Sequence, residues 1–118
     1  MQDILSVIPP DPIDFSEKTA FTLAGQGTLE LPDLMTSAER LSTSGNKDKA
    51  AELYRLWLAH TASPLAYVAC FNLGVILSSG NEYVQAEAMY RKALELNPSL
   101  FQASINLGNC LEQQKRED

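Results

Sequence analysis

The sequence repeats itself at a spacing of 34 residues, and this repeat limits the possible folds more than any other feature. Residues 64–81 match residues 98–115 at six of 18 positions: Pro64/Pro98, Ala69/Ala103, Asn72/Asn106, Leu73/Leu107, Gly74/Gly108 and Leu77/Leu111. A fainter copy lies upstream at a spacing of 36, pairing Ala50, Tyr54, Arg55 and Leu58 with Ala86, Tyr90, Arg91 and Leu94. Periods of this length are typical of stacked units that bury a face against their neighbours.

Each half of the repeat has the pattern of an amphipathic helix with marked ends. In the most complete unit, Ser63-Pro64 has the hydroxyl and the ring that favour a helix start. Apolar residues then recur at spacings of three and four, and Gly80-Asn81 predicts the end of this helix. A second apolar stripe runs over residues 83–94 until Asn97-Pro98 stops it. The pattern therefore predicts an antiparallel helical hairpin.

Similar patterns lie on both sides of this hairpin. Residues 33–44 and 46–60 predict a first hairpin, and residues 99–114 predict the first helix of a third. We therefore expect an all-α solenoid of about two and a half repeats, with units at 31–63, 64–97 and an incomplete 98–118. Residues 1–30 do not repeat and form an acidic, proline-containing N-terminal segment.

These residues resemble the tetratricopeptide repeat family, in which Leu-Gly, Ala, an aromatic residue and Pro recur at set intervals. The match runs through Leu73-Gly74, Ala86, Tyr90, Ala93 and Pro98. Cys70 and Leu77 stand where the family has large aromatic residues. Close helix packing explains the pattern, because Gly74 and Ala86 let two helices approach and Tyr90 fills the space between hairpins.

A solenoid of this kind has a concave face lined by the first helix of each unit, and we expect a polypeptide partner there. Asn72 and its repeat Asn106 are the recurring polar residues of that face. A side-chain amide can pair with one peptide unit of an extended ligand. The alternative interpretation is that these asparagines only bond within the repeat. The predicted peptide-binding residues are Asn72, Asn106, Asn109, Val75 and Phe71.

A second resemblance is more specific. The segments Tyr54–Leu58, Phe71–Gly74 and Asn106–Gly108 are similar to the N-terminal repeat region of bacterial SPINDLY-type, O-linked N-acetylglucosamine transferase-like proteins. The resemblance implies that asparagines before Leu-Gly hold an acceptor polypeptide, and that a glycosyltransferase domain follows. The alternative is a free-standing adaptor that assembles proteins. A clamp for chaperone C-termini fits less well, because the basic residues that such a clamp needs are missing beside the asparagines.

Charge and hydropathy exclude several other partners. The net charge is −6, and residues 1–33 hold six acids against the single base Lys18. Nucleic acids and anionic membranes favour basic surfaces, so we expect neither as a partner. No apolar run approaches the length of a membrane span, and the N-terminus lacks the pattern of a secretory signal. We expect a cytoplasmic protein, unless a leader was removed.

The sequence offers no catalytic constellation. The single histidine, His60, lies at a predicted helix end, where a cation is favourable for the helix dipole. Gly25-Gln26-Gly27 lacks the third glycine of a dinucleotide fingerprint. Cys70 and Cys110 are too few and too far apart for a metal site, and we expect buried thiols. We therefore predict no enzymatic activity, cofactor or metal in this chain.

The two ends of the chain leave apolar residues to be covered. For residues 1–30 we expect a cap on the first hairpin that is partly helical, with the concave groove or a neighbouring molecule as alternative docking sites. The helix over residues 99–114 needs a second helix against it. Either the chain is a piece of a longer protein, which we favour, or two copies form a homodimer through this helix or through the N-terminal segment.

Overall fold

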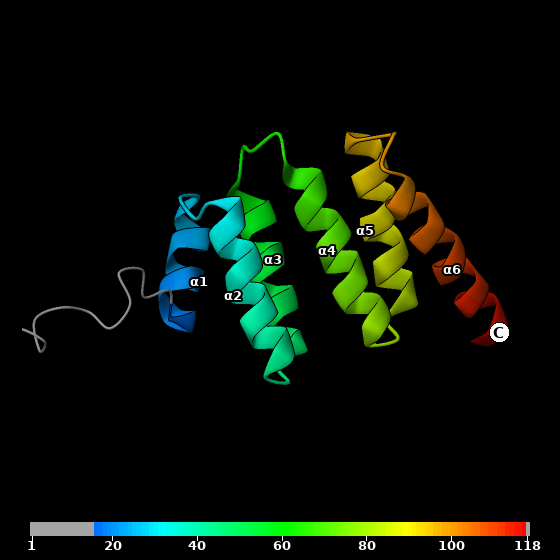
Figure 1. Ribbon diagram of the computed structural model, residues 1–118, viewed down its shortest axis with the longest axis horizontal. Helices are drawn as coiled ribbons and strands as arrows, with labels where there is room; N and C mark the ends of the chain where they lie inside the picture. Colours follow the sequence, from blue (N-terminus) through cyan, green and yellow to red (C-terminus); the bar gives the residue numbers. More distant parts are fainter. Residues whose placement is uncertain (1–15, 118) are drawn as a thin grey trace, which may run out of the picture.

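The computed structural model describes residues 16–117, which fold into six helices and no strand (Figure 1). The predicted all-α hairpin solenoid is confirmed. The helices are α1 (Glu17–Gln26), α2 (Leu31–Thr43), α3 (Lys47–His60), α4 (Ala66–Ser79), α5 (Tyr83–Leu96) and α6 (Phe101–Glu117).

Two turns of the same design close the hairpins α2–α3 and α4–α5. In the first, Gly45 is left-handed with φ 89°, and Asn46 N donates to Leu41 O at 2.8 Å. In the second, Asn81 is left-handed with φ 63°, and Glu82 N donates to Leu77 O at 2.9 Å. This bond satisfies a carbonyl that the ending helix leaves free. Asparagine replaces glycine in the second turn because it tolerates the left-handed conformation better than other side chains do.

Helix α4 begins two residues later than the sequence predicts. The structure has a tight turn at Ser63-Pro64, in which Leu65 N donates to Ser63 Oγ at 3.1 Å and Ala66 N donates to Ser63 O at 3.3 Å. The hydroxyl of Ser63 therefore stabilises the turn that leads into α4 and does not cap the helix itself.

Helices α4 and α5 approach closely at Gly74. A Cβ atom added to Gly74 would lie 2.6 Å from Cε1 of Tyr90, well inside van der Waals contact. Tyr90 is 1% exposed, and its ring also lies beside that of Phe71, with centroids 5.9 Å apart. The predicted role of Gly74 in bringing two helices together is confirmed.

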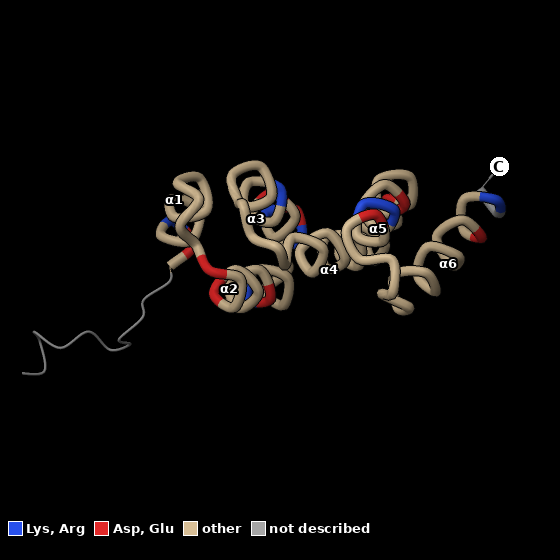
Figure 2. The backbone as a smooth tube through the Cα atoms, turned by 90° about the horizontal axis from the view of Figure 1, so that it is seen from above, with Lys and Arg blue, Asp and Glu red and all other residues tan. Residues whose placement is uncertain are grey.

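The helices alternate between two layers, with α1, α3 and α5 on one side and α2, α4 and α6 on the other (Figure 2). The core between the layers is built from small and large apolar residues of all six helices, among them Ala24, Leu34, Leu53, Trp57, Leu73, Tyr90 and Cys110. Both cysteines are free and buried, as predicted, and burial raises the pKa of each thiol.

Helix α1 covers the first hairpin by packing against α3. Its residues Ala20 and Ala24 are fully buried, and Glu17 pairs with Lys49 of α3 at 2.7 Å. Trp57 is buried and its Nε1 donates to Leu29 O at 2.7 Å, which fixes the link between α1 and α2. Residues 1–15 of the predicted cap lie outside the described residues, so the cap as a whole stays a prediction.

The outer face of α6 is open. Phe101, Ile105 and Leu111 are 78%, 56% and 40% exposed, and a Cβ atom added to Gly108 would meet no neighbour within 4 Å. On α4, the matching face is covered by α5.

Candidate functional site

Two pockets lie along the layer formed by α2, α4 and α6. The first, which we call the α2–α4 pocket, has a volume of about 460 Å³. It lies between α2 and α4, and Tyr54 of α3 is the only residue of its lining that comes from the other layer. Its lining residues are Met35, Ala38, Glu39, Ser42, Thr43, Tyr54, Asn72, Val75 and Ile76.

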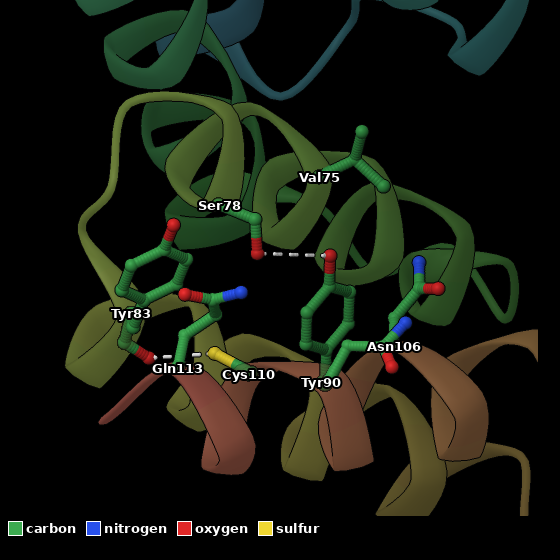
Figure 3. Close-up of a pocket in the computed structure, with 8 residues that line it drawn as sticks. Val75, Ser78, Tyr83, Tyr90, Asn106, Cys110 and Gln113 are labelled. Carbon is green, nitrogen blue, oxygen red and sulfur yellow. Dashed lines mark hydrogen bonds between the residues drawn. The ribbon is translucent and has the colours of Figure 1, made fainter. Parts of the chain in front are cut away.

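The second, the α4–α6 pocket, has a volume of about 290 Å³ and lies one helix further along (Figure 3). Inside it, the Tyr90 and Ser78 hydroxyls lie 3.3 Å apart, and Cys110 Sγ donates to Tyr83 O at 2.9 Å. These contacts fix the inner wall, since both join different helices. The lining residues are Val75, Ser78, Tyr83, Tyr90, Asn106, Asn109, Cys110 and Gln113.

The two pockets are the same site in successive repeats. Each has a serine from the earlier first helix, a tyrosine from the second helix, and an asparagine from the next first helix. The matching pairs, offset by 36 residues up to the tyrosine and by 34 after it, are Glu39/Val75, Ser42/Ser78, Tyr54/Tyr90, Asn72/Asn106, Val75/Asn109 and Ile76/Cys110. Val75 lines both pockets, so the two form one continuous groove over α4.

Each asparagine interacts with the tyrosine of the preceding hairpin. Burial raises the pKa of Tyr54, and hydrogen bonding to the Asn72 side chain opposes that rise. Burial likewise raises the pKa of Tyr90, opposed by hydrogen bonding to Ser78 and Asn106. Asn106 Oδ1 also accepts from Gln102 Nε2 at 3.2 Å, so the internal bonding that the sequence left open as an alternative is present at Asn106. An amide has two donor hydrogens and a carbonyl acceptor, so one internal bond leaves capacity for a ligand.

Four of the five predicted site residues line this groove. Asn72 and Val75 line the α2–α4 pocket, and Val75, Asn106 and Asn109 line the α4–α6 pocket. Phe71 lines neither pocket; its half-buried ring packs against Tyr90 instead.

The polar edges of the two tyrosines and their neighbouring serines were not predicted from the sequence. Tyr54 and Tyr90 are core residues by burial, yet each contributes to a pocket wall. Ser42 and Ser78 recur at the same spacing of 36 residues as the tyrosines. That shared spacing was the available signal, because residues that recur together in a solenoid lie together on one face.

The groove carries little charge. Among the residues that line the two pockets, Glu39 is the only charged one. Helix α4 has no Lys, Arg, Asp or Glu, and its tube is tan throughout in Figure 2. His60 is exposed and is the last residue of α3.

Within residues 16–117, no group of three His, Cys, Asp or Glu side chains is arranged to hold a metal ion. No helix of this part of the chain combines the length and the apolar character needed to cross a bilayer.

Comparison with known families supports the resemblance seen in the sequence. The tetratricopeptide repeat model matches residues 67–100, which hold most of α4 and all of α5. Tetratricopeptide repeats generally mediate protein–protein interaction. No curated protein matches the chain.

Proposed function

We propose that this chain is a polypeptide-binding module whose ligand lies in the groove formed by the α2–α4 and α4–α6 pockets. The observation that carries the proposal is the repeated lining of the two pockets. An accidental gap in the packing between helices is not expected to recur one repeat later with the same serine, tyrosine and asparagine in its lining. A repeated site suits a repeated ligand, and a polypeptide backbone presents the same amide at every residue.

In this proposal Asn72 and Asn106 hold successive peptide units of the ligand, and Asn109 and Val75 complete the wall between them. Both asparagines are half-buried, so their side chains have few orientations to lose when a ligand binds. Asn106 Oδ1 also accepts from Gln102 Nε2 at 3.2 Å, which further fixes its amide. Phe71 supports the site indirectly by packing against Tyr90.

The test is a titration of blocked heptapeptide pools into the wild-type chain and the double variant Asn72→Ala, Asn106→Ala, followed by fluorescence anisotropy. We expect the double variant to bind at least about 10-fold more weakly, since each lost hydrogen bond contributes on the order of 1 kcal/mol. Gln85→Ala is the matched control, because it removes an exposed amide of α5 outside the groove. Equal binding by the double variant and the wild type would reject the asparagine contacts.

A second proposal, self-association, follows from the open face of α6. Phe101 and Ile105 are among the most exposed large apolar residues of the described chain, and they lie on one helix. Exposed apolar surface of this kind favours contact with another molecule. Sedimentation of the wild type and of Ile105→Glu at several concentrations tests it: a concentration-dependent dimer that the substitution dissociates supports a homodimer, and a monomer in both rejects it.

The finer proposal concerns the parent protein. Resemblance to SPINDLY-type proteins supports a cytoplasmic acceptor-recognition or scaffolding region of a glycosyltransferase-like protein. Sequencing the reading frame beyond Asp118 tests this proposal. A glycosyltransferase domain there supports it, and a stop codon there leaves the alternative, a free-standing adaptor.

A further inference from the structure

The two pockets share a plan but differ in one charge, and that difference bears on the ligand. At the position that Glu39 occupies in the α2–α4 pocket, the α4–α6 pocket has Val75. None of the ion pairs formed among residues 16–117 involves Glu39, whose side chain is exposed. The groove thus has a negative end and an uncharged end.

The α2–α4 pocket has the features that a long basic side chain requires. Met35, Ala38, Val75 and Ile76 offer an apolar wall for the methylene stem of a lysine or arginine. Glu39 supplies a carboxylate for the charged head, and the Tyr54 hydroxyl and Asn72 carbonyl oxygen supply further acceptors. At about 460 Å³, the pocket is also the larger of the two.

Geometry sets the spacing between the two ligand side chains. The pockets flank the face of α4 that carries Val75, so we take their centres to be about one helix diameter, ~10 Å, apart. In a polyproline II segment, residues i and i+3 face the same side and are about 9 Å apart. Such a segment places one side chain in each pocket without bending its backbone.

We propose that the groove selects an extended peptide with a lysine or arginine in the α2–α4 pocket and an uncharged residue three positions away in the α4–α6 pocket. This selectivity rests on the proposed function, since it requires the same groove to bind polypeptides. Charge complementarity argues for a basic ligand, because the sole charged lining residue is acidic and the whole chain carries −6. The Glu39 carboxylate repels an acidic side chain placed in the α2–α4 pocket.

The experiment uses acetylated and amidated heptapeptide pools in which one central residue is fixed as Lys, Arg, norleucine or Glu. Binding to the full chain is measured by fluorescence anisotropy at low and high salt. We expect the Lys and Arg pools to bind about 3- to 10-fold more tightly than the norleucine pool, and the Glu pool to bind most weakly. Added salt is expected to reduce the preference.

The substitution Glu39→Gln tests the residue itself. We expect it to abolish the preference for Lys and Arg while binding of the norleucine pool stays unchanged. Glu52→Gln on α3 is the matched control, since it removes the same charge from an exposed residue that lines neither pocket. Far-UV circular dichroism checks that both variants keep their helices.

The outcomes separate this inference from the proposed function. If no pool binds, the polypeptide groove itself is rejected. If pools bind without preferring Lys or Arg, or if Glu39→Gln keeps the preference, the groove stands and the basic-residue pocket is rejected. If Glu39→Gln and Glu52→Gln lose the preference for Lys and Arg equally, the preference comes from the net charge of the chain, and the basic-residue pocket is rejected.

Discussion

Helices α4 and α6 carry the same Leu-Gly pair in very different surroundings. On α4, Leu73 is fully buried and Gly74 lies against the Tyr90 ring. On α6, Leu107 is half-buried and Gly108 faces open space. The repeat thus specifies which residue belongs at the helix contact. The energy of that contact depends on the second helix of the same hairpin, which α4 has in α5 and which α6 lacks among residues 16–117.

The largest expected effect comes from deleting the buried leucine. Leu73→Ala removes a fully buried side chain from the core, and we expect a loss of about 2–5 kcal/mol in the free energy of unfolding. Leu107→Ala removes a half-buried side chain next to an open face, and we expect a smaller loss, below about 2 kcal/mol. Urea denaturation measures both. Equal losses would show that α6 is packed as tightly as α4.

The paired glycine substitution is expected to change stability in opposite directions. In Gly74→Ala the new methyl group collides with Tyr90, and we expect a destabilisation of about 1–3 kcal/mol. In Gly108→Ala nothing obstructs the methyl group, and the better helix propensity of alanine predicts a gain of up to about 1 kcal/mol. The midpoints of urea denaturation report the sign directly. A loss in Gly108→Ala would mean that another surface covers α6 in solution.

A smaller effect is expected at the contact between α5 and α6. Glu87 Oε1 accepts from Gln114 Nε2 at 2.8 Å, and Glu87 also pairs with Arg91 at 2.8 Å. The hydrogen bond from Gln114, followed by that from Arg91, holds the pKa of the Glu87 carboxyl below its usual value. A carboxyl whose pKa is lower in the folded state stabilises the fold above its unfolded pKa, and this contribution disappears as the pH falls through the folded pKa.

We therefore expect Glu87→Gln to reduce stability at pH 7 by roughly 1 kcal/mol or less, and to have no such effect well below pH 4. Urea denaturation of the two proteins at pH 7 and pH 3 measures this difference. Glu95→Gln serves as the control, because its 3.9 Å pair with Lys92 is exposed and within one helix. A difference that persists at pH 3 would contradict the role of the ionised carboxylate.

Spacing in the sequence was sufficient to predict helices α2 to α6, their pairing and the close approach at Gly74, because helix contacts in a solenoid recur with the repeat. It was insufficient at Ser63, where a local side-chain bond delayed the start of α4. It also did not indicate that the Phe71 ring packs against Tyr90. Whether a side chain at a helix edge lines a pocket or packs inward depends on the rotation of three helices, and a one-dimensional pattern does not contain that rotation.

The same limit explains why the pocket-lining edges of Tyr54 and Tyr90 were not predicted. Tyr90 was predicted to fill the space between hairpins, and its burial confirms this prediction; Tyr54 is buried as well. Their pocket-forming edges follow only when the next first helix is in place, since Asn72 and Asn106 belong to that helix. The binding role of the asparagines stays a prediction.

The most direct test of the groove is a nuclear magnetic resonance titration of the ¹⁵N-labelled chain with a blocked lysine-containing heptapeptide. We predict that the largest shift changes occur at the side-chain amides of Asn72 and Asn106 and at the backbone amide of Val75, with the Gln85 side-chain amide on α5 unchanged. Largest changes along the outer surface of α3 and α5, or at Phe101 and Ile105 on α6, would contradict the groove as the polypeptide-binding site.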